Sequence, residues 1–66
     1  MGMPDPWPTL DEQIAEIERE LKLRGHTYPR WISQGKLSPI NAQQQIGRLR
    51  AARVSLLELK GLRGNG

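Results

Sequence analysis

Two series of apolar residues at helical spacing dominate this sequence. The first series steps along the chain by four, three and four residues: Leu10, Ile14, Ile17 and Leu21. Such steps place side chains in a narrow seam along one side of an α-helix. Thr9 followed by Glu12 has the spacing of a capping box, and Gly25 is a residue typical of helix ends. We therefore predict a first helix over about residues 9–24.

The second series predicts a longer helix. Ser38 suits the N-cap, Pro39 suits the first helical position, and Gly61 is a stop signal. Between them, the residues that share one face are Ala42, Ile46, Leu49, Ala52, Leu56 and Leu59. This face is about 140° wide, which is broader than a contact between two helices needs. We predict a second helix over about residues 39–60.

The segment between the helices, residues 26–38, is long for a helix–helix loop. Pro29 can open a single turn and Gly35 can end it, so we predict a short structured corner. Residues 1–8 hold three prolines and predict an extended arm, whereas residues 61–66 predict a flexible tail. The fold class is therefore all-α, an antiparallel helical hairpin.

Charge is distributed unevenly along the chain. The first 24 residues carry six acids and three bases, a net charge of −3, and the rest carries seven bases and one acid, a net charge of +6. Antiparallel packing brings the acidic start of the first helix to the basic end of the second. The pairs that we expect join Glu12 and Glu16 to Arg53 and Lys60. This explains much of the asymmetry, and a nucleic-acid-binding surface is the alternative explanation.

A chain of 66 residues needs support beyond its own core. It has no cysteine, and its one histidine, His26, cannot hold a metal alone. A second copy of the chain is then the most natural stabiliser, and two hairpins face to face make a four-helix bundle. The predicted dimer core is Leu10, Ile14, Ile17, Leu21, Ile46, Leu49 and Leu56. Alternatively, the open face binds a different partner.

No pattern in the sequence indicates catalysis. His26 has no nucleophile motif near it, and Glu12, Glu16 and Glu20 are interpreted as a solvated helix face. No apolar run is long enough to cross a membrane, and the first residues do not have the pattern of a secretion signal. We therefore expect a cytoplasmic protein that is not an enzyme and holds no cofactor or metal.

Arginine and aromatic side chains are the candidates for partner binding, because both are enriched at binding hot spots. The candidate residues are Tyr28, Arg30, Trp31, Arg50 and Arg53. An alternative interpretation packs the aromatic residues over the ends of the hairpin, with Trp7 over the start of the first helix. If the partner is nucleic acid, the contacts to phosphates would come from Arg48, Arg50 and Arg53.

The stretch from Tyr28 to Ser38, Tyr-Pro-Arg-Trp-Ile-Ser-Gln-Gly-Lys-Leu-Ser, with Ala42, Ile46 and Leu49 after it, resembles a family of short phage and prophage proteins. Those proteins carry a Tyr-Pro-Arg corner, a Gly and a Ser/Thr-capped helix, and the resemblance covers roughly residues 14–57. It implies a bacteriophage protein in the cytoplasm of a bacterial host. Small phage proteins without catalytic residues often take part in host takeover by inhibiting a host protein, such as a transcriptional activator (as an anti-activator) or a defence factor. The expected function is therefore a regulator that binds and occludes a host protein, and a nucleic-acid-binding hairpin dimer is the alternative.

Overall fold

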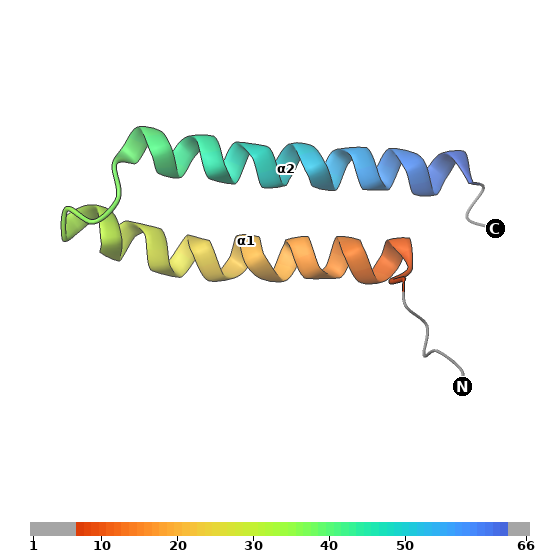
Figure 1. The fold of residues 1–66 in the computed structure, drawn as a ribbon, viewed down its shortest axis with the longest axis horizontal. Helices are drawn as coiled ribbons and strands as arrows, with labels where there is room; N and C mark the ends of the chain where they lie inside the picture. The colour runs from red at the N-terminus through yellow and green to blue at the C-terminus, as the bar shows by residue number, and fades with distance from the viewer. Residues whose placement is uncertain (1–6, 64–66) are drawn as a thin grey trace.

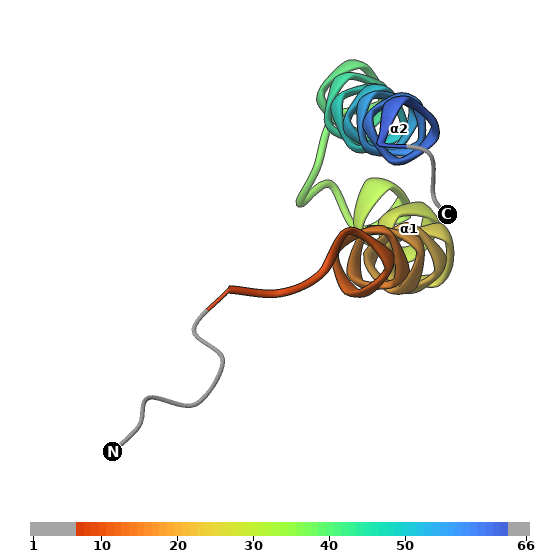
Figure 2. The same cartoon turned by 90° about the vertical axis from the view of Figure 1, so that its right-hand side faces the viewer.

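The computed structural model describes residues 7–63, which form two antiparallel α-helices packed side by side (Figure 1). Helix α1 spans Leu10–Ser33 and helix α2 spans Pro39–Leu62, with 24 residues each. At 1.5 Å per residue each helix is about 36 Å long. A view along the helices shows one layer of two helices in the described range (Figure 2). The predicted all-α helical hairpin is confirmed.

Both predicted helix starts are confirmed by their caps. The hydroxyl oxygen of Thr9 accepts a hydrogen bond from the Glu12 amide at 3.1 Å, and the Glu12 carboxylate accepts one from the Thr9 amide at 2.8 Å. At the start of α2, Ser38 Oγ accepts a hydrogen bond from the Asn41 amide at 3.0 Å, and Pro39 follows it. Each cap satisfies an amide that would otherwise lack a partner at the helix end.

The predicted end of the first helix at residue 24 is wrong, because α1 continues through Gly25 and Pro29 to Ser33. The predicted corner over residues 26–38 is thereby reduced to the five residues 34–38. Gly35, which was expected to end a separate turn of the corner, instead follows the end of α1, with a φ of 74° that glycine adopts at little cost. The Gly35 amide donates to the Ile32 carbonyl at 3.0 Å and the next amide donates to the Trp31 carbonyl at 2.8 Å, which is a Schellman motif.

The helix continues past Gly25 because Tyr28 belongs to the same seam as the earlier apolar residues. Steps of three and four residues join Ile14, Ile17, Leu21, Arg24 and Tyr28. The Tyr28 side chain is buried, and its hydroxyl donates a hydrogen bond to Gln45 Oε1 of α2 at 2.6 Å. A helical Gly costs about 1 kcal/mol and a helical Pro about 3 kcal/mol relative to Ala. Burial of a large ring yields about 1.5–3 kcal/mol and a hydrogen bond about 1 kcal/mol, so packing on α2 offsets most of that cost.

Gly25→Ala is expected to stabilise the hairpin. Gly25 is exposed within α1, and an added Cβ would meet no neighbouring atom within 4 Å. The substitution removes the entropic cost of a helical glycine, about 1 kcal/mol, which corresponds to a rise in Tm of about 4–8 °C. Thermal unfolding followed by circular dichroism at a fixed chain concentration measures the change. A lower Tm would show that the turn before Pro29 requires the freedom of glycine.

The ends of the hairpin also differ from expectation. Helix α2 includes Gly61 and ends at Leu62, so the predicted boundary at residue 60 and the start of the tail are wrong. In this last turn Lys60 pairs with Asp11 of α1, with Nζ and Oδ1 2.6 Å apart. Trp7 is 76% exposed, so it is not buried over the start of α1 as one interpretation expected. The rest of the predicted arm and tail, residues 1–6 and 64–66, lies outside the described residues.

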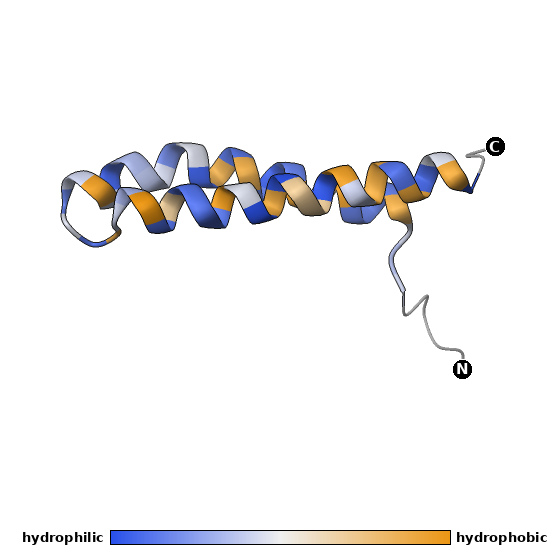
Figure 3. Ribbon diagram, turned by 90° about the horizontal axis from the view of Figure 1, so that it is seen from above, coloured by the Kyte–Doolittle hydropathy of each residue, from blue (hydrophilic) through white to orange (hydrophobic). Residues whose placement is uncertain are grey.

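The core of the hairpin is small. Within the described range three apolar side chains are buried, Ile14, Tyr28 and Ala42. Helix α2 carries apolar residues on exposed sides as well as in the core, and orange segments alternate with blue ones along both helices (Figure 3). The large apolar side chains that stay exposed are Trp7, Leu23, Trp31, Ile40, Val54, Leu57, Leu59 and Leu62. Neither helix is apolar enough over a sufficient length to cross a membrane, as judged on residues 7–63.

Opposite charges do face each other across the hairpin, but through different acids from those predicted. Arg53 Nε lies 2.8 Å from Glu18 Oε2, and Lys60 pairs with Asp11, so the expected pairing with Glu12 and Glu16 is wrong. Asp11 and Glu18 are seven residues apart and therefore share one side of α1. We call this the bridged side of the hairpin. Because all four side chains are substantially exposed, each bridge contributes less than about 1 kcal/mol.

Candidate protein-binding surfaces

A second seam runs along α1 on the side away from the bridges. Its residues step by four and three in alternation: Gln13, Ile17, Glu20, Arg24, Thr27 and Trp31. We call this the groove seam. At 100° per residue, Trp31 lies about 140° around α1 from Glu18, which marks the bridged side. The groove seam and the bridged side are therefore different surfaces of the hairpin.

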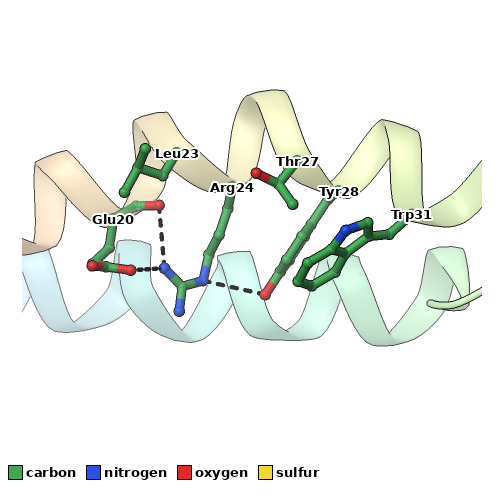
Figure 4. A pocket seen from close by; sticks show the side chains of 6 residues that line it. All are labelled: Glu20, Leu23, Arg24, Thr27, Tyr28 and Trp31. Carbon is green, nitrogen blue, oxygen red and sulfur yellow. Dashed lines mark hydrogen bonds and ion pairs between the residues drawn. The ribbon is translucent and has the colours of Figure 1, made fainter.

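Two hollows open along the groove seam. The first, of about 290 Å³, is lined by Glu20, Leu23, Arg24, Thr27, Tyr28 and Trp31 (Figure 4). The second, of about 450 Å³, lies nearer the start of α1 and is lined by Pro8, Glu12, Gln13, Glu16, Ile17 and Leu56. The larger hollow is lined by the apolar side chains of Ile17 and Leu56 and by two carboxylates. Volumes of about 300–1,000 Å³ are typical of sites that accept a drug-sized group.

Polar contacts fix the side chains around the smaller hollow. Arg24 forms an ion pair with Glu20 and donates from Nε to the Tyr28 hydroxyl at 3.2 Å. It also donates to the main-chain carbonyl of Glu20 at 3.3 Å. The hydrogen bond that Arg24 donates to Glu20, and then the one that it donates to Tyr28, raise the pKa of Arg24 above its ordinary value. The guanidinium is therefore held in one place on the groove seam before any partner arrives.

The two aromatic residues of the predicted corner have different environments. Tyr28, expected to contact a partner, is instead buried between the helices and bonded to Gln45. Trp31 is 41% exposed, and its ring centre lies 5.9 Å from that of Tyr28 with the rings tilted by 30°. Figure 4 shows both rings side by side at the end of the hollow. Trp31 and the exposed Arg30 thus remain accessible for a partner.

Helix α2 presents a separate exposed surface, which we call the outer strip. It follows the same alternation of three and four residues: Gly47, Arg50, Val54, Leu57 and Gly61. Val54 is 51% exposed and Leu57 is 39% exposed. A Cβ built on either glycine meets no neighbouring atom within 4 Å, so packing within the chain does not explain their lack of a side chain. Arg50 is also exposed on this strip.

The candidate arginines of α2 do not form one row. Arg53 is already held by Glu18. Arg48 and Arg50 are both exposed but differ by two positions, which places them about 160° apart around the helix. Arg50 lies near the bridged side with Arg53, whereas Trp31 lies on the groove seam. The residues predicted to bind one partner therefore belong to two surfaces.

The predicted dimer core lies mainly between α1 and α2 of one chain. Ile14 is buried within the hairpin, and the other six residues of that set are half-buried. Sequence reasoning missed the groove seam because Gln13, Glu20 and Thr27 are polar. The signal that could have found it is the spacing, since the groove seam has the same alternation of three and four residues as the apolar series and shares Ile17 and Arg24 with it.

Within residues 7–63, no three histidine or acidic side chains lie close enough together to hold a metal ion. The chain matches no protein-family model, no curated protein and no solved structure. Evidence for function therefore comes from the exposed surfaces of the hairpin.

Proposed function

We propose that this chain is a small protein-binding regulator that inhibits a partner protein by covering one of its functional surfaces. The observation that carries the proposal is the outer strip of α2. Exposed Val54 and Leu57 lie beside Arg50 on a surface that has no structural task within the hairpin. Exposed apolar side chains that lie together indicate an interaction surface, and arginine is enriched at protein interfaces. The resemblance to small phage proteins supports a host protein as the partner.

The spacing of the outer strip favours a helix as the partner's contacting element. Steps of three and four residues match the contact pattern of two packed helices. The open positions at Gly47 and Gly61 allow a partner to approach the backbone closely at both ends of the strip. The centre, at Val54 and Leu57, supplies the apolar contact.

The nucleic-acid alternative has weaker support. Phosphate binding needs several free cations on one surface. Here Arg53 is engaged by Glu18, and Arg48 lies on the other side of α2 from Arg50. Part of the charge asymmetry of the sequence is explained by the two ion pairs that join α1 to α2.

We also propose that two hairpins assemble into a four-helix bundle. The support is the small amount of apolar surface that one hairpin buries, with Leu23, Trp31 and Leu59 left exposed away from the outer strip. A second hairpin against the groove seam would remove such side chains from water. The outer strip would stay free for the partner protein.

Val54→Asp is expected to weaken partner binding strongly. Aspartate has nearly the same helix propensity as valine, so the helix itself is little changed. A tagged chain is used to capture proteins from nuclease-treated bacterial lysate, and the captured protein is purified and titrated against each variant. A charge at the centre of the strip should weaken binding by about thirtyfold or more, the effect of losing a hot spot.

Arg48→Glu is the matched control, because it changes charge on α2 outside the outer strip. It should retain the captured protein. Binding that survives an increase from 50 to 200 mM salt fits a protein partner, whereas a protein making several phosphate contacts loses about 10³–10⁵ in affinity over that range. Capture of nucleic acid alone from the same lysate without nuclease treatment, lost with Arg48→Glu, would overturn the proposed function.

A further inference from the structure

The groove seam of α1 is complementary to itself when two copies run in opposite directions. When a two-fold axis at position 22 relates the two copies, each residue of the groove seam in one copy lies opposite a groove-seam residue of the other. The opposing positions are then Gln13 with Trp31, Ile17 with Thr27, and Glu20 with Arg24. We propose that a second copy of this chain docks here, α1 against α1, with Trp31 of each copy seated in the larger hollow of the other. This rests on the four-helix bundle proposed above and is independent of the outer strip.

Charge favours this pairing over a parallel one. Residues 10–21 of α1 carry five acids and one base, and residues 22–33 carry three bases and no acid. Antiparallel pairing sets the acidic half of each copy against the basic half of the other, whereas parallel pairing sets like charges together. Like charges brought together at an interface suppress the wrong arrangement. The helix dipoles are also antiparallel in the favoured arrangement.

At the two-fold axis, the ion pairs of both copies come together. Glu20 and Arg24 of one copy face Arg24 and Glu20 of the other, which makes a square of alternating charges. Both side chains are part-buried in the single hairpin, and Arg24 is already held by Tyr28. Little side-chain freedom is lost when such a fixed pair meets its copy.

Shape favours the pairing at its two ends. Trp31 is exposed, and the hollow of about 450 Å³ that it would enter is lined by Gln13 and Ile17, with Leu56 from α2. Glu12 and Glu16 at the edge of that hollow would lie near Arg30 of the second copy. A tryptophan in an apolar pocket with an arginine beside it is the usual composition of an interface hot spot.

Sedimentation equilibrium of the full chain over about 1–500 μM tests the inference. The wild type is expected to dimerise, and Trp31→Ala is expected to raise the dimer Kd by about thirtyfold. Circular dichroism checks that each variant remains helical. Val54→Asp is the control, because it lies on the outer strip and should leave the dimer Kd unchanged. If Val54→Asp loses partner capture but still dimerises, the outer strip binds the partner and the groove seam forms the dimer.

A charge exchange tests the register. Glu20→Arg and Arg24→Glu should each be monomeric, because each places four like charges at the axis. An equimolar mixture of the two variants should form a heterodimer, since their charges are complementary again. A wild type that stays monomeric up to 500 μM, or a folded Trp31→Ala with an unchanged dimer Kd, would overturn the inference. If the charge variants do not fold, the Trp31→Ala result decides alone.

Discussion

Tyr28→Ala is expected to lower the free energy of unfolding by about 3–5 kcal/mol, the range for removing a buried aromatic ring. Tyr28 is one of three buried apolar side chains in the described range, and it joins α1 to Gln45 of α2. A chain of 66 residues has a total stability of only about 3–10 kcal/mol. The variant should therefore be largely unfolded in mild denaturant, which urea titration followed by circular dichroism measures.

Tyr28→Phe is the matched control, because it keeps the ring and removes the hydroxyl that contacts both Arg24 and Gln45. Its cost should be about 1 kcal/mol, since Gln45 is exposed and water can replace the lost partner. If Tyr28→Ala and Tyr28→Phe lowered the free energy of unfolding equally, the hydrogen bonds of Tyr28 and not its ring would be the source of the stabilisation. A loss below 1 kcal/mol for Tyr28→Ala would contradict the role of the ring in holding the last turns of α1.

Pro29→Ala is expected to raise the free energy of unfolding by about 2–3 kcal/mol. Proline inside a helix lacks the amide that would donate to the carbonyl four residues earlier, here that of Gly25, and its ring crowds that carbonyl. Alanine restores the donor and is the best helix former. Because Pro29 is exposed, little packing is lost with its ring. The urea midpoint at equal chain concentration reports the gain.

Pro39→Ala is the control for this effect, because Pro39 is at the first turn of α2, where proline is well suited. It should be neutral or slightly destabilising. If Pro29→Ala were also neutral or destabilising, the local backbone geometry at Pro29 would be required for placing Tyr28 and Trp31. Sedimentation of Pro29→Ala would then show whether the dimer proposed on the groove seam is weakened too.

The candidate surfaces were only partly predictable. Trp31 and Arg50 could be selected from the sequence as accessible hot-spot residues, and both are exposed. That they lie on different sides of the hairpin depends on the register between α1 and α2, which the Arg53–Glu18 contact defines. The sequence left Tyr28 open between a partner contact and packing over the end of the hairpin, because an aromatic residue beside a proline in a connection is compatible with both, and the structure buries it.

The sequence by itself determined the two helices, their starts at Thr9 and Ser38 and the antiparallel hairpin. These depend on local chemistry: side-chain caps and the spacing of apolar residues. Only the tertiary structure decided that α1 continues through Gly25 and Pro29. Both residues disfavour a helix locally, and the helix persists because burial of Tyr28 against α2 offsets that cost.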